Sequence, residues 1–257
     1  EVHRSYNPKG SFLANLRESD PNSIKIGLTG TPLLGTDVNS KMLFGGYIHK
    51  YYYNQSIADN YTLRLIREEI ETTYKVSLNK ILAELQIKQG DADRKYIYSH
   101  TRFVEPMLDY IVKNLEDGRI SLGDETIGGM VICDSSEQAK EMQTIFKAKY
   151  ANKETSAMLN EPNVLSMAAE PKPSYGSQKA TERKVNSSAI ILHDIGTKKE
   201  REDWVQEFKD GKIDLLFVYN MLLTGFDAKR LKKLYIGRVI KAHNLLQALT
   251  RVNRTYK

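Results

Sequence analysis

Cysteine is almost absent from this 257-residue sequence, and long apolar runs are absent altogether. Cys133 is the single cysteine, which excludes an intramolecular disulfide framework and a cysteine-rich zinc site. It lies in the apolar run at 130–133, a position that favours a buried small hydrophobe over a nucleophile. No apolar run approaches the roughly 18–20 residues that span a bilayer, and the first residues lack a signal-peptide pattern. We therefore expect a soluble, cytoplasmic protein that makes no contact with membranes.

A strong charge bias is also missing. The sequence has 38 Lys and Arg against 32 Asp and Glu, a net charge of +6 and a pI near 9.1. This mild excess permits a polyanionic partner without requiring one. Hydrophobic residues make up 40% and charged residues 27%, which is an ordinary globular balance, and the length suits one large or two modest domains.

The first hundred residues contain two candidate strand regions followed by helical patterns. A short β-type run at 23–28 ends at the segment 29–32, and the aromatic-rich stretch at 44–53 could supply another strand or two. Apolar residues then recur at helical spacing from Tyr61 to about Gln89. A second helix is expected from about Phe103 to Leu115.

Strand-then-helix units follow. Strands are expected at 129–133, 189–192, 213–219 and 231–236, and helices at 137–150, 199–208 and 243–252. The polar stretch at 154–185 contains three prolines and reads as a long surface excursion. Alternating apolar strands and helices predict an α/β fold with a parallel sheet covered by helices on both faces.

Polar residues and glycines follow three of these strands. In open parallel sheets, ligands bind at the carboxyl ends of the strands. The segments 29–32 (TGTP) and 224–227 (TGFD) place hydroxyls, a glycine and, in the second, a carboxylate there. Ser135 and Ser136 begin a helix, where free backbone amides favour a phosphate. Each segment taken alone is more typical of a capped turn than of a ligand site.

The last expected helix carries a basic stripe. Gln247, Arg251 and Arg254 are spaced i, i+4 and i+7, so we expect all three on one helical face. Two guanidinium groups beside an amide would form a multidentate anion clamp. A solvated basic face or a row of ion pairs is the alternative. The occurrence of all four segments in this order favours the clamp.

That order resembles the paired RecA-like motor of superfamily 2 helicases and translocases. Residues 1–4 resemble the end of a Walker B motif, D-E-x-H, whose Asp would precede Glu1. Motif III is resembled by residues 27–32 and motif IV by residues 131–136. Motif V is resembled by residues 222–228 and motif VI by residues 247–254. More narrowly, the strings EVHRS, LTGTPL, FGGYIHKY, LLTGFDA and HNLLQALTRVNR resemble type I restriction enzyme R subunits. The resemblance spans nearly the whole chain.

The resemblance implies a RecA-like α/β fold preceded by the remnant of another lobe. Residues 1–60 would be the C-terminal part of the first motor lobe, and residues 61–257 the second lobe. The chain would then be a piece of a longer subunit, cut at both ends. Its parent would be an ATP-dependent type I site-specific deoxyribonuclease that uses ATP and Mg²⁺.

The resemblance also assigns catalytic and nucleotide-binding roles. Glu1 and His3 would be catalytic, with Glu1 orienting the attacking water beside a Mg²⁺ whose ligand precedes residue 1, so no metal ligand is expected within the chain. Arg254, with Arg251, would act as an arginine finger that neutralises charge in the transition state. The residues expected on the nucleotide side of the second lobe are Gly225, Asp227 and Gln247.

The remaining implied roles concern coupling and DNA. Thr29, Gly30 and Thr31 would couple the phosphate site to the interface between lobes, and Ser135 and Thr224 would contact phosphates of the tracked DNA strand. Such contacts carry no sequence information, as a motor that walks on any sequence requires. The implied partners are double-stranded DNA and the modification and specificity subunits of the restriction complex.

Three positions depart from the family pattern, and two motifs are missing. Thr250 precedes Arg251 where many relatives have Gly, Lys229 stands where Pro is common, and Gly237 replaces a carboxylate before Arg238. Neither the phosphate-binding pattern G-x-x-x-x-G-K-S/T nor an acidic–Lys nuclease constellation occurs in the sequence. We therefore expect the isolated chain not to hydrolyse ATP.

Two other functions remain open. The chain could be the second motor lobe of another superfamily 2 helicase or remodeller, or a catalytically silent nucleic-acid-binding module that kept the fold. The histidines at 49, 100 and 193 lack metal-ligand spacing and are expected to be structural. His243 fits either the family string or the capping and packing of the last helix.

Overall fold

The computed structural model describes residues 15, 18–19, 21–30, 32, 40–89, 94–151, 185–222, 226–240 and 242–255. Contacts divide the chain into two compact units. Unit 1 comprises Glu1–Ile66, Leu223–Asp227 and Val239–Lys257, and unit 2 comprises Arg67–Leu222 and Ala228–Arg238.

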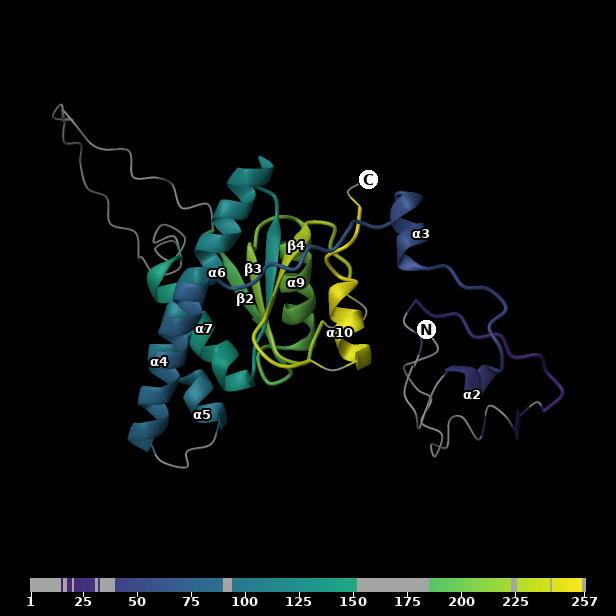
Figure 1. The fold of residues 1–257 in the computed structure, drawn as a ribbon, viewed down its shortest axis with the longest axis horizontal. Coiled ribbons are helices and arrows are strands. Elements are labelled where there is room, and N and C mark those ends of the chain that lie inside the picture. The colour runs from purple at the N-terminus through teal and green to yellow at the C-terminus, as the bar shows by residue number, and fades with distance from the viewer. Residues whose placement is uncertain are drawn as a thin grey trace, which may run out of the picture. The chain divides into compact units, whose positions relative to one another are not determined.

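Unit 2 contains a four-stranded sheet (Figure 1). Its strands are β1 (Gly128–Ile132), β2 (Ser188–Ile191), β3 (Leu215–Val218) and β4 (Leu231–Ile236). The spatial order is β2-β3-β1-β4, and all three neighbouring pairs are parallel. Strands β1 and β3 are buried throughout, as expected for a parallel sheet covered on both sides. The predicted α/β fold with a parallel sheet is confirmed.

The two glycines at the start of β1 show which helices cover which face of the sheet. A Cβ at Gly128 would lie 2.7 Å from the ring of Phe208, which belongs to α9 (Lys198–Lys209). A Cβ at Gly129 would lie 3.3 Å from Leu115 of α6 (Thr101–Leu122). Because successive residues of a strand point to opposite faces, α9 and α6 lie on opposite faces of the sheet. Helix α7 (Ser136–Lys149) joins α6 on its face, where Phe146 contacts Phe217 of β3.

Local signals set the bounds of the helices in unit 2. The ring of His100 caps α6 by accepting a hydrogen bond from the Arg102 amide, a structural role for this histidine. The helix ends at Gly123, whose φ of 62° suits a glycine. Helices α4 (Thr72–Gln89) and α5 (Arg94–Ser99) pack on α6, and α5 also packs on α7. The sequence predicted a helix from residue 61 to about residue 89. Its first part is wrong, because residues 61–71 are not helical and α4 begins at Thr72.

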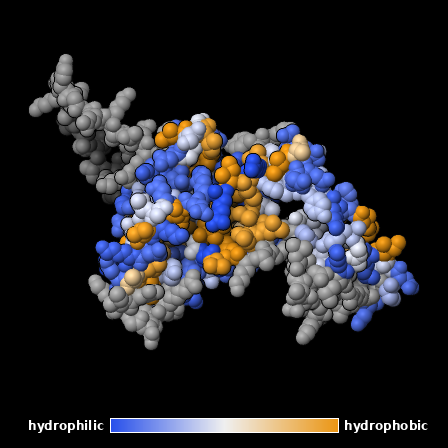
Figure 2. Space-filling view, viewed as in Figure 1, coloured by the Kyte–Doolittle hydropathy of each residue, from blue (hydrophilic) through white to orange (hydrophobic). Residues whose placement is uncertain are grey.

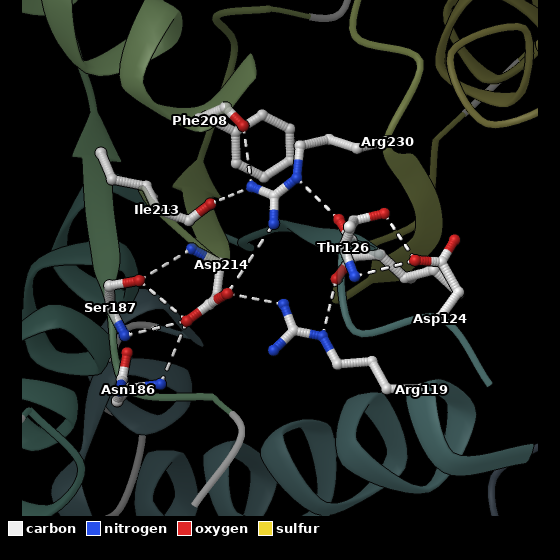
Figure 3. Close-up of polar contacts among 10 residues, drawn as sticks. Arg119, Asp124, Thr126, Asn186, Ser187, Phe208, Ile213, Asp214 and Arg230 are labelled. Atoms are coloured by element: carbon white, nitrogen blue, oxygen red, sulfur yellow. Dashed lines mark hydrogen bonds and ion pairs between the residues drawn. The ribbon is translucent and has the colours of Figure 1, made fainter. Parts of the chain in front are cut away.

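A buried group of charges lies where the four strands begin (Figure 3). Asp214, directly before β3, accepts from Arg119 of α6 at 2.6 Å and lies 3.8 Å from Arg230, directly before β4. Both arginine side chains are at most 5% exposed. The other carboxylate oxygen accepts from the backbone N–H groups of Asn186 and Ser187, directly before β2. One carboxylate thus connects the amino ends of three strands.

The arginines complete this network through backbone carbonyls. Arg119 donates to the carbonyl of Ile127, and Arg230 donates to those of Thr126, Phe208 and Ile213 (Figure 3). Saturation of this kind is what makes a buried charge tolerable in a low-dielectric interior. This network was not predicted from the sequence, because the ion-paired residues Arg119 and Asp214 are 95 positions apart.

Unit 1 contains the helices α2 (Ser40–Phe44), α3 (Tyr53–Ala58) and α10 (Ala242–Leu249). The strands predicted at 23–28 and within 44–53 are wrong, because neither segment forms a strand. Ile24, Ile26 and Leu28 are 90%, 65% and 79% exposed. Figure 2 shows that hydrophobic residues also reach the surface elsewhere on the face in view. An apolar run becomes a strand only where a partner strand and a packed face are available to it.

Helix α10 is shorter than predicted. The chain leaves the helix after Leu249, and the amides of Arg251 and Val252 bond three residues back instead of four. The Thr250 hydroxyl also donates to the carbonyl of Gln247, a side-chain bond that competes with regular helix. Within the part of the chain that the structure describes, no helix is long and apolar enough to cross a membrane.

Candidate functional site

Asp227 and Arg254 form an ion pair in unit 1. Arg254 Nη1 lies 2.7 Å from Asp227 Oδ2, and the two side chains are 39% and 56% exposed. These residues come from the two segments that sequence reasoning placed at the nucleotide, and they are 27 positions apart. The structure therefore brings together a predicted nucleotide-side carboxylate and the predicted finger arginine, and it leaves both within reach of solvent.

Arg251 lies in a different environment. It is 8% exposed, and its Nη1 donates to the carbonyl of Phe226 at 2.7 Å while its Nε donates to that of Gln247 at 3.2 Å. It therefore ties the backbone next to Asp227 to the end of α10. A guanidinium whose donors point at buried carbonyls holds the loop in place and is not presented to solvent.

The prediction that Gln247, Arg251 and Arg254 share one helical face is wrong. Only Gln247 lies within α10, and it is 4% exposed. Arg251 follows the helix in a turn, and Arg254 forms an isolated antiparallel bridge with Thr62. The clamp is thus divided into a buried arginine that fixes the loop and an exposed arginine paired with a carboxylate. The i+7 spacing failed because the helix ends two residues before Arg251.

Ser135 caps α7 in unit 2. Its side-chain oxygen accepts from the Gln138 amide at 3.1 Å, and the residue is 1% exposed. The capped-turn interpretation of this segment is confirmed, while the predicted contact with a DNA phosphate stays a prediction.

Cys133 is fully buried, and burial raises the pKa of its thiol well above the usual range. It is therefore a core residue and not a nucleophile, as predicted.

Sequence reasoning noticed Arg238 only as a departure from the family pattern, but the structure gives it defined partners at the carboxyl edge of the sheet. Its guanidinium lies over the Tyr219 ring, 4.5 Å from the centroid, and Nη2 donates to the Tyr219 carbonyl and to Asn220 Oδ1. The preceding Gly237 is required by close approach, since a Cβ there would lie 2.9 Å from the carbonyl oxygen of Ile132. A carboxylate side chain in its place would crowd this carbonyl oxygen.

Several candidate residues remain untested. Glu1, His3, Thr31, Thr224 and Gly225 lie outside the described residues. Thr29 and Gly30 are described and belong to unit 1, in a segment without regular secondary structure. A Cβ at Gly30 would meet nothing within 4 Å, so crowding does not explain this glycine.

A metal centre is not found in the described ranges. Within them, no group of three or more His, Cys, Asp or Glu side chains could hold a metal ion. His193 contributes its backbone carbonyl to Arg201, a contact that fixes the loop after β2. These observations assign no metal ligand to the described residues of either unit.

Comparisons with known proteins identify relatives of both parts of the chain. A family model for domain 3 of the type I restriction enzyme subunit R matches residues 126–257, and a SWI2/SNF2 ATPase model matches residues 1–96. The chain is 27% identical over 274 residues to the type I restriction enzyme MjaIXP endonuclease subunit of Methanocaldococcus jannaschii, covering 100% of this chain and 24% of that protein. It is 24% identical over 265 residues to the HindI endonuclease subunit of Haemophilus influenzae, covering 95% of this chain and 23% of that protein.

A solved structure shares the fold. It is a fragment of an HsdR subunit of a type I restriction enzyme from Vibrio vulnificus, with a TM-score of 0.52 and 18% identity over 96% of this chain and 40% of that one. The predicted α/β RecA-like fold is confirmed. The chain spans about a quarter of the length of the curated relatives named above.

Proposed function

This chain belongs to the type I restriction enzyme subunit R family, and we propose that it is part of the ATP-dependent, DNA-translocating motor of such a subunit. The relatives carry the names of endonuclease subunits, and the chain corresponds to about a quarter of their length. ATP hydrolysis, translocation and DNA cleavage would accordingly be activities of the whole subunit, to which this chain contributes one side of the nucleotide site.

The observation that supports this proposal most directly is the Asp227–Arg254 pair. A planar guanidinium matches the oxygens of a phosphate, and Arg254 is exposed enough to meet one. Asp227 would keep the guanidinium close to the loop at 226–227 before the nucleotide arrives. In the motor, Arg254 would then neutralise charge that develops on the γ-phosphate in the transition state.

The buried Arg251 would support the proposed role of Arg254 by holding the loop in place. Its bond to the Phe226 carbonyl fixes the residue next to Asp227, and its bond to Gln247 fixes the end of α10. Catalytic groups must be held within fractions of an ångström of the productive geometry, and buried hydrogen bonds provide that constraint. Arg251 and Gln247 would therefore act by positioning the loop, and Arg254 by contact.

The other parts of the nucleotide site would come from elsewhere. The sequence has no G-x-x-x-x-G-K-S/T loop to cradle the phosphates. Glu1 and His3 would belong to a Walker B segment beside Mg²⁺. Gly225 would line the nucleotide. Coupling of that site to the second lobe would fall to Thr29, Gly30 and Thr31. Purified residues 1–257 would then show no magnesium-dependent ATP turnover by themselves.

The proposed partners are double-stranded DNA and the modification and specificity subunits, in the cytoplasm. Thr224 and Ser135 would face phosphates of the tracked strand. For Ser135 the buried hydroxyl already accepts the Gln138 amide, so its proton is the group it could offer a phosphate. Contacts with phosphates position a motor on DNA without restricting the sequence on which it moves.

The test is Arg254→Ala in the R subunit that carries this chain, assembled with its modification and specificity subunits. We expect DNA-stimulated ATP turnover to fall by about 10³- to 10⁵-fold, the range for loss of an arginine finger. Arg254→Lys keeps the charge without the planar fork and should retain only part of the activity.

The matched control is Lys41→Ala, which removes an exposed cation of the same unit, in α2 and outside residues 61–65. It should leave turnover unchanged. Wild-type turnover in Arg254→Ala would reject the finger role and favour the catalytically silent nucleic-acid-binding module. Turnover lost equally in both variants would show that general charge, and not this position, matters.

A further inference from the structure

Arg254 lies at a contact between two segments far apart in the sequence. Thr62 and Arg254 form an antiparallel bridge, and the Leu63 amide donates to the Asn253 carbonyl at 2.6 Å. Both partners belong to unit 1. We call residues 61–65 the strap. The backbone of Arg254 lies beyond the end of α10, so the strap supplies a constraint that the helix does not.

The strap is fastened to helix α3 along its first two residues. The amides of Tyr61 and Thr62 both donate to the carbonyl of Ser56, at 2.9 and 3.3 Å. The Thr62 hydroxyl donates to the Ser56 hydroxyl at 3.1 Å, and Ser56 itself is buried. The start of the strap is therefore anchored at the C-terminal end of α3 by three polar contacts.

A single hydroxyl fastens the rest of the strap. Tyr53, the first residue of α3, donates its hydroxyl to the Leu63 carbonyl at 2.7 Å and accepts from the Leu65 amide, also at 2.7 Å. The peptide groups of Leu63 thus face two ways, with the N–H toward Asn253 and the C=O toward Tyr53. A continuous line of hydrogen bonds leads from the Tyr53 hydroxyl to the residue before Arg254.

We propose that the Tyr53 hydroxyl is a positioning group for Arg254, acting through the strap. The inference rests on the proposed role of Arg254, and it assigns a use to Tyr53, which lies two positions after the end of the string FGGYIHKY at 44–51. Arg254 has a long side chain with many rotamers, and one ion pair on the surface orients such a chain weakly. A fixed backbone at 253–254 reduces the entropy that Arg254 would lose on meeting a phosphate.

Hydrogen–deuterium exchange of the R subunit tests the strap without any turnover. Tyr53→Phe keeps the ring and removes the hydroxyl, so the Leu65 amide loses its acceptor and the Leu63 carbonyl its donor. We expect amide exchange in peptides covering 61–65 and 251–254 to rise by about three- to ten-fold, the change that corresponds to one lost hydrogen bond. Tyr61→Phe is the matched control, because Tyr61 lies on the strap and is 70% exposed. Unchanged exchange in Tyr53→Phe would overturn the proposal.

ATP turnover in a double-mutant cycle tests the link to Arg254. In the assembled enzyme, Tyr53→Phe should lower kcat by about three- to ten-fold and leave KM for ATP within about two-fold, because it disturbs a group that acts in the transition state. In an Arg254→Lys background the same change should cost less than about two-fold, since the planar fork that Tyr53 positions is already gone. An equal loss in both backgrounds would mean that Tyr53 acts on general stability, and the proposal would be rejected.

The two measurements separate this inference from the proposed function. If Arg254→Ala keeps wild-type turnover, the finger role fails, and exchange alone decides whether Tyr53 holds the segment of Arg254. If Arg254→Ala abolishes turnover while Tyr53→Phe changes neither exchange nor kcat, the finger role stands and the positioning role fails.

Discussion

The two units of this chain are stabilised in different ways. Unit 2 has a parallel sheet with buried strands, helices on both faces and a saturated charge network where the strands begin. In unit 1 the helices α2, α3 and α10 have five, six and eight residues, and several large apolar side chains, such as Ile24 and Ile48, are exposed. Its segments are held by individual polar contacts, among them the Asp227–Arg254 pair and the strap. Unit 2 is thus stabilised mainly by burial, whereas the candidate site in unit 1 is held by a few hydrogen bonds and ion pairs.

This difference has a physical consequence for function. Burial of a large core is cooperative and resists the loss of one surface contact, whereas a segment held by a few hydrogen bonds opens at low cost. Groups that change partners during a catalytic cycle are drawn from segments with a low free energy of local opening. The weakly held segment of unit 1 would therefore suit the proposed role of Arg254, which would exchange the Asp227 carboxylate for a phosphate.

The largest expected effect comes from breaking the buried network of unit 2. Asp214→Asn would leave Arg119 and Arg230 with no carboxylate in a site where all three side chains are at most 11% exposed. Removing one partner of a buried ion pair typically costs about 3–5 kcal/mol. We expect a loss of unfolding free energy of that size, measured by urea unfolding with the fluorescence of Trp204. This residue is the only tryptophan of the chain and lies in α9 of unit 2.

Asp203→Asn is the control for this prediction, because Asp203 is an exposed aspartate of the same helix as the tryptophan. It should leave the free energy of unfolding within about 0.5 kcal/mol of the parent value. A loss below about 1 kcal/mol in Asp214→Asn would mean that the network is not a main support of the sheet, and that the contrast between the units is smaller than we infer.

A smaller and more local effect is expected in unit 1. Arg251→Leu would remove the guanidinium donor from the carbonyls of Phe226 and Gln247, although the Thr250 hydroxyl would still donate to the Gln247 carbonyl. Loss of such a donor at a buried carbonyl costs about 1–3 kcal/mol. We expect faster hydrogen exchange in peptides covering 226–228 and 247–254, with Lys41→Leu in α2 as the exposed control. Exchange at the parent rate in Arg251→Leu would contradict the role of Arg251 in holding the loop.

The same contrast explains which elements could be predicted from the sequence. Strand β4 was predicted with its observed bounds, and the Ser135 cap was read from its local pattern. These features depend on apolar runs and on side chains a few positions apart. The ion pair between Arg119 and Asp214 depends on a contact across 95 positions, for which one sequence holds no signal.

The candidate site was predicted in part for the same reason. Asp227 and Arg254 were identified by motif order, and the structure brings them together. The shared helical face for Arg251 and Arg254 was wrong, since spacing alone does not show that a helix ends at Leu249. Tyr53 was missed because its importance comes from Leu63 and Leu65, whose role depends on the distant Asn253.

The smallest expected effect concerns an ion pair on the surface of unit 2. Glu68 lies 2.6 Å from Lys233 of β4, and the hydrogen bond from Lys233 holds the pKa of Glu68 below its ordinary value of 4.5. A lowered pKa in the folded state means that the pair contributes stability above about pH 4.5, which is lost as the pH falls through the lowered value. Because Glu68 is 56% exposed, solvent screening limits that contribution to roughly 0.2–1 kcal/mol.

Carbon-detected NMR titration of the Glu68 carboxyl measures this directly. Lys233→Gln should return the pKa of Glu68 toward 4.5 and flatten the acid limb of the stability curve by the same small amount. Lys232→Gln, at the neighbouring position of β4, is the matched control and should leave the Glu68 titration unchanged. An equal shift in both variants would assign the effect to the net charge of the unit. The pair would then add nothing specific to the sheet, which would rest on burial and the Asp214 network alone.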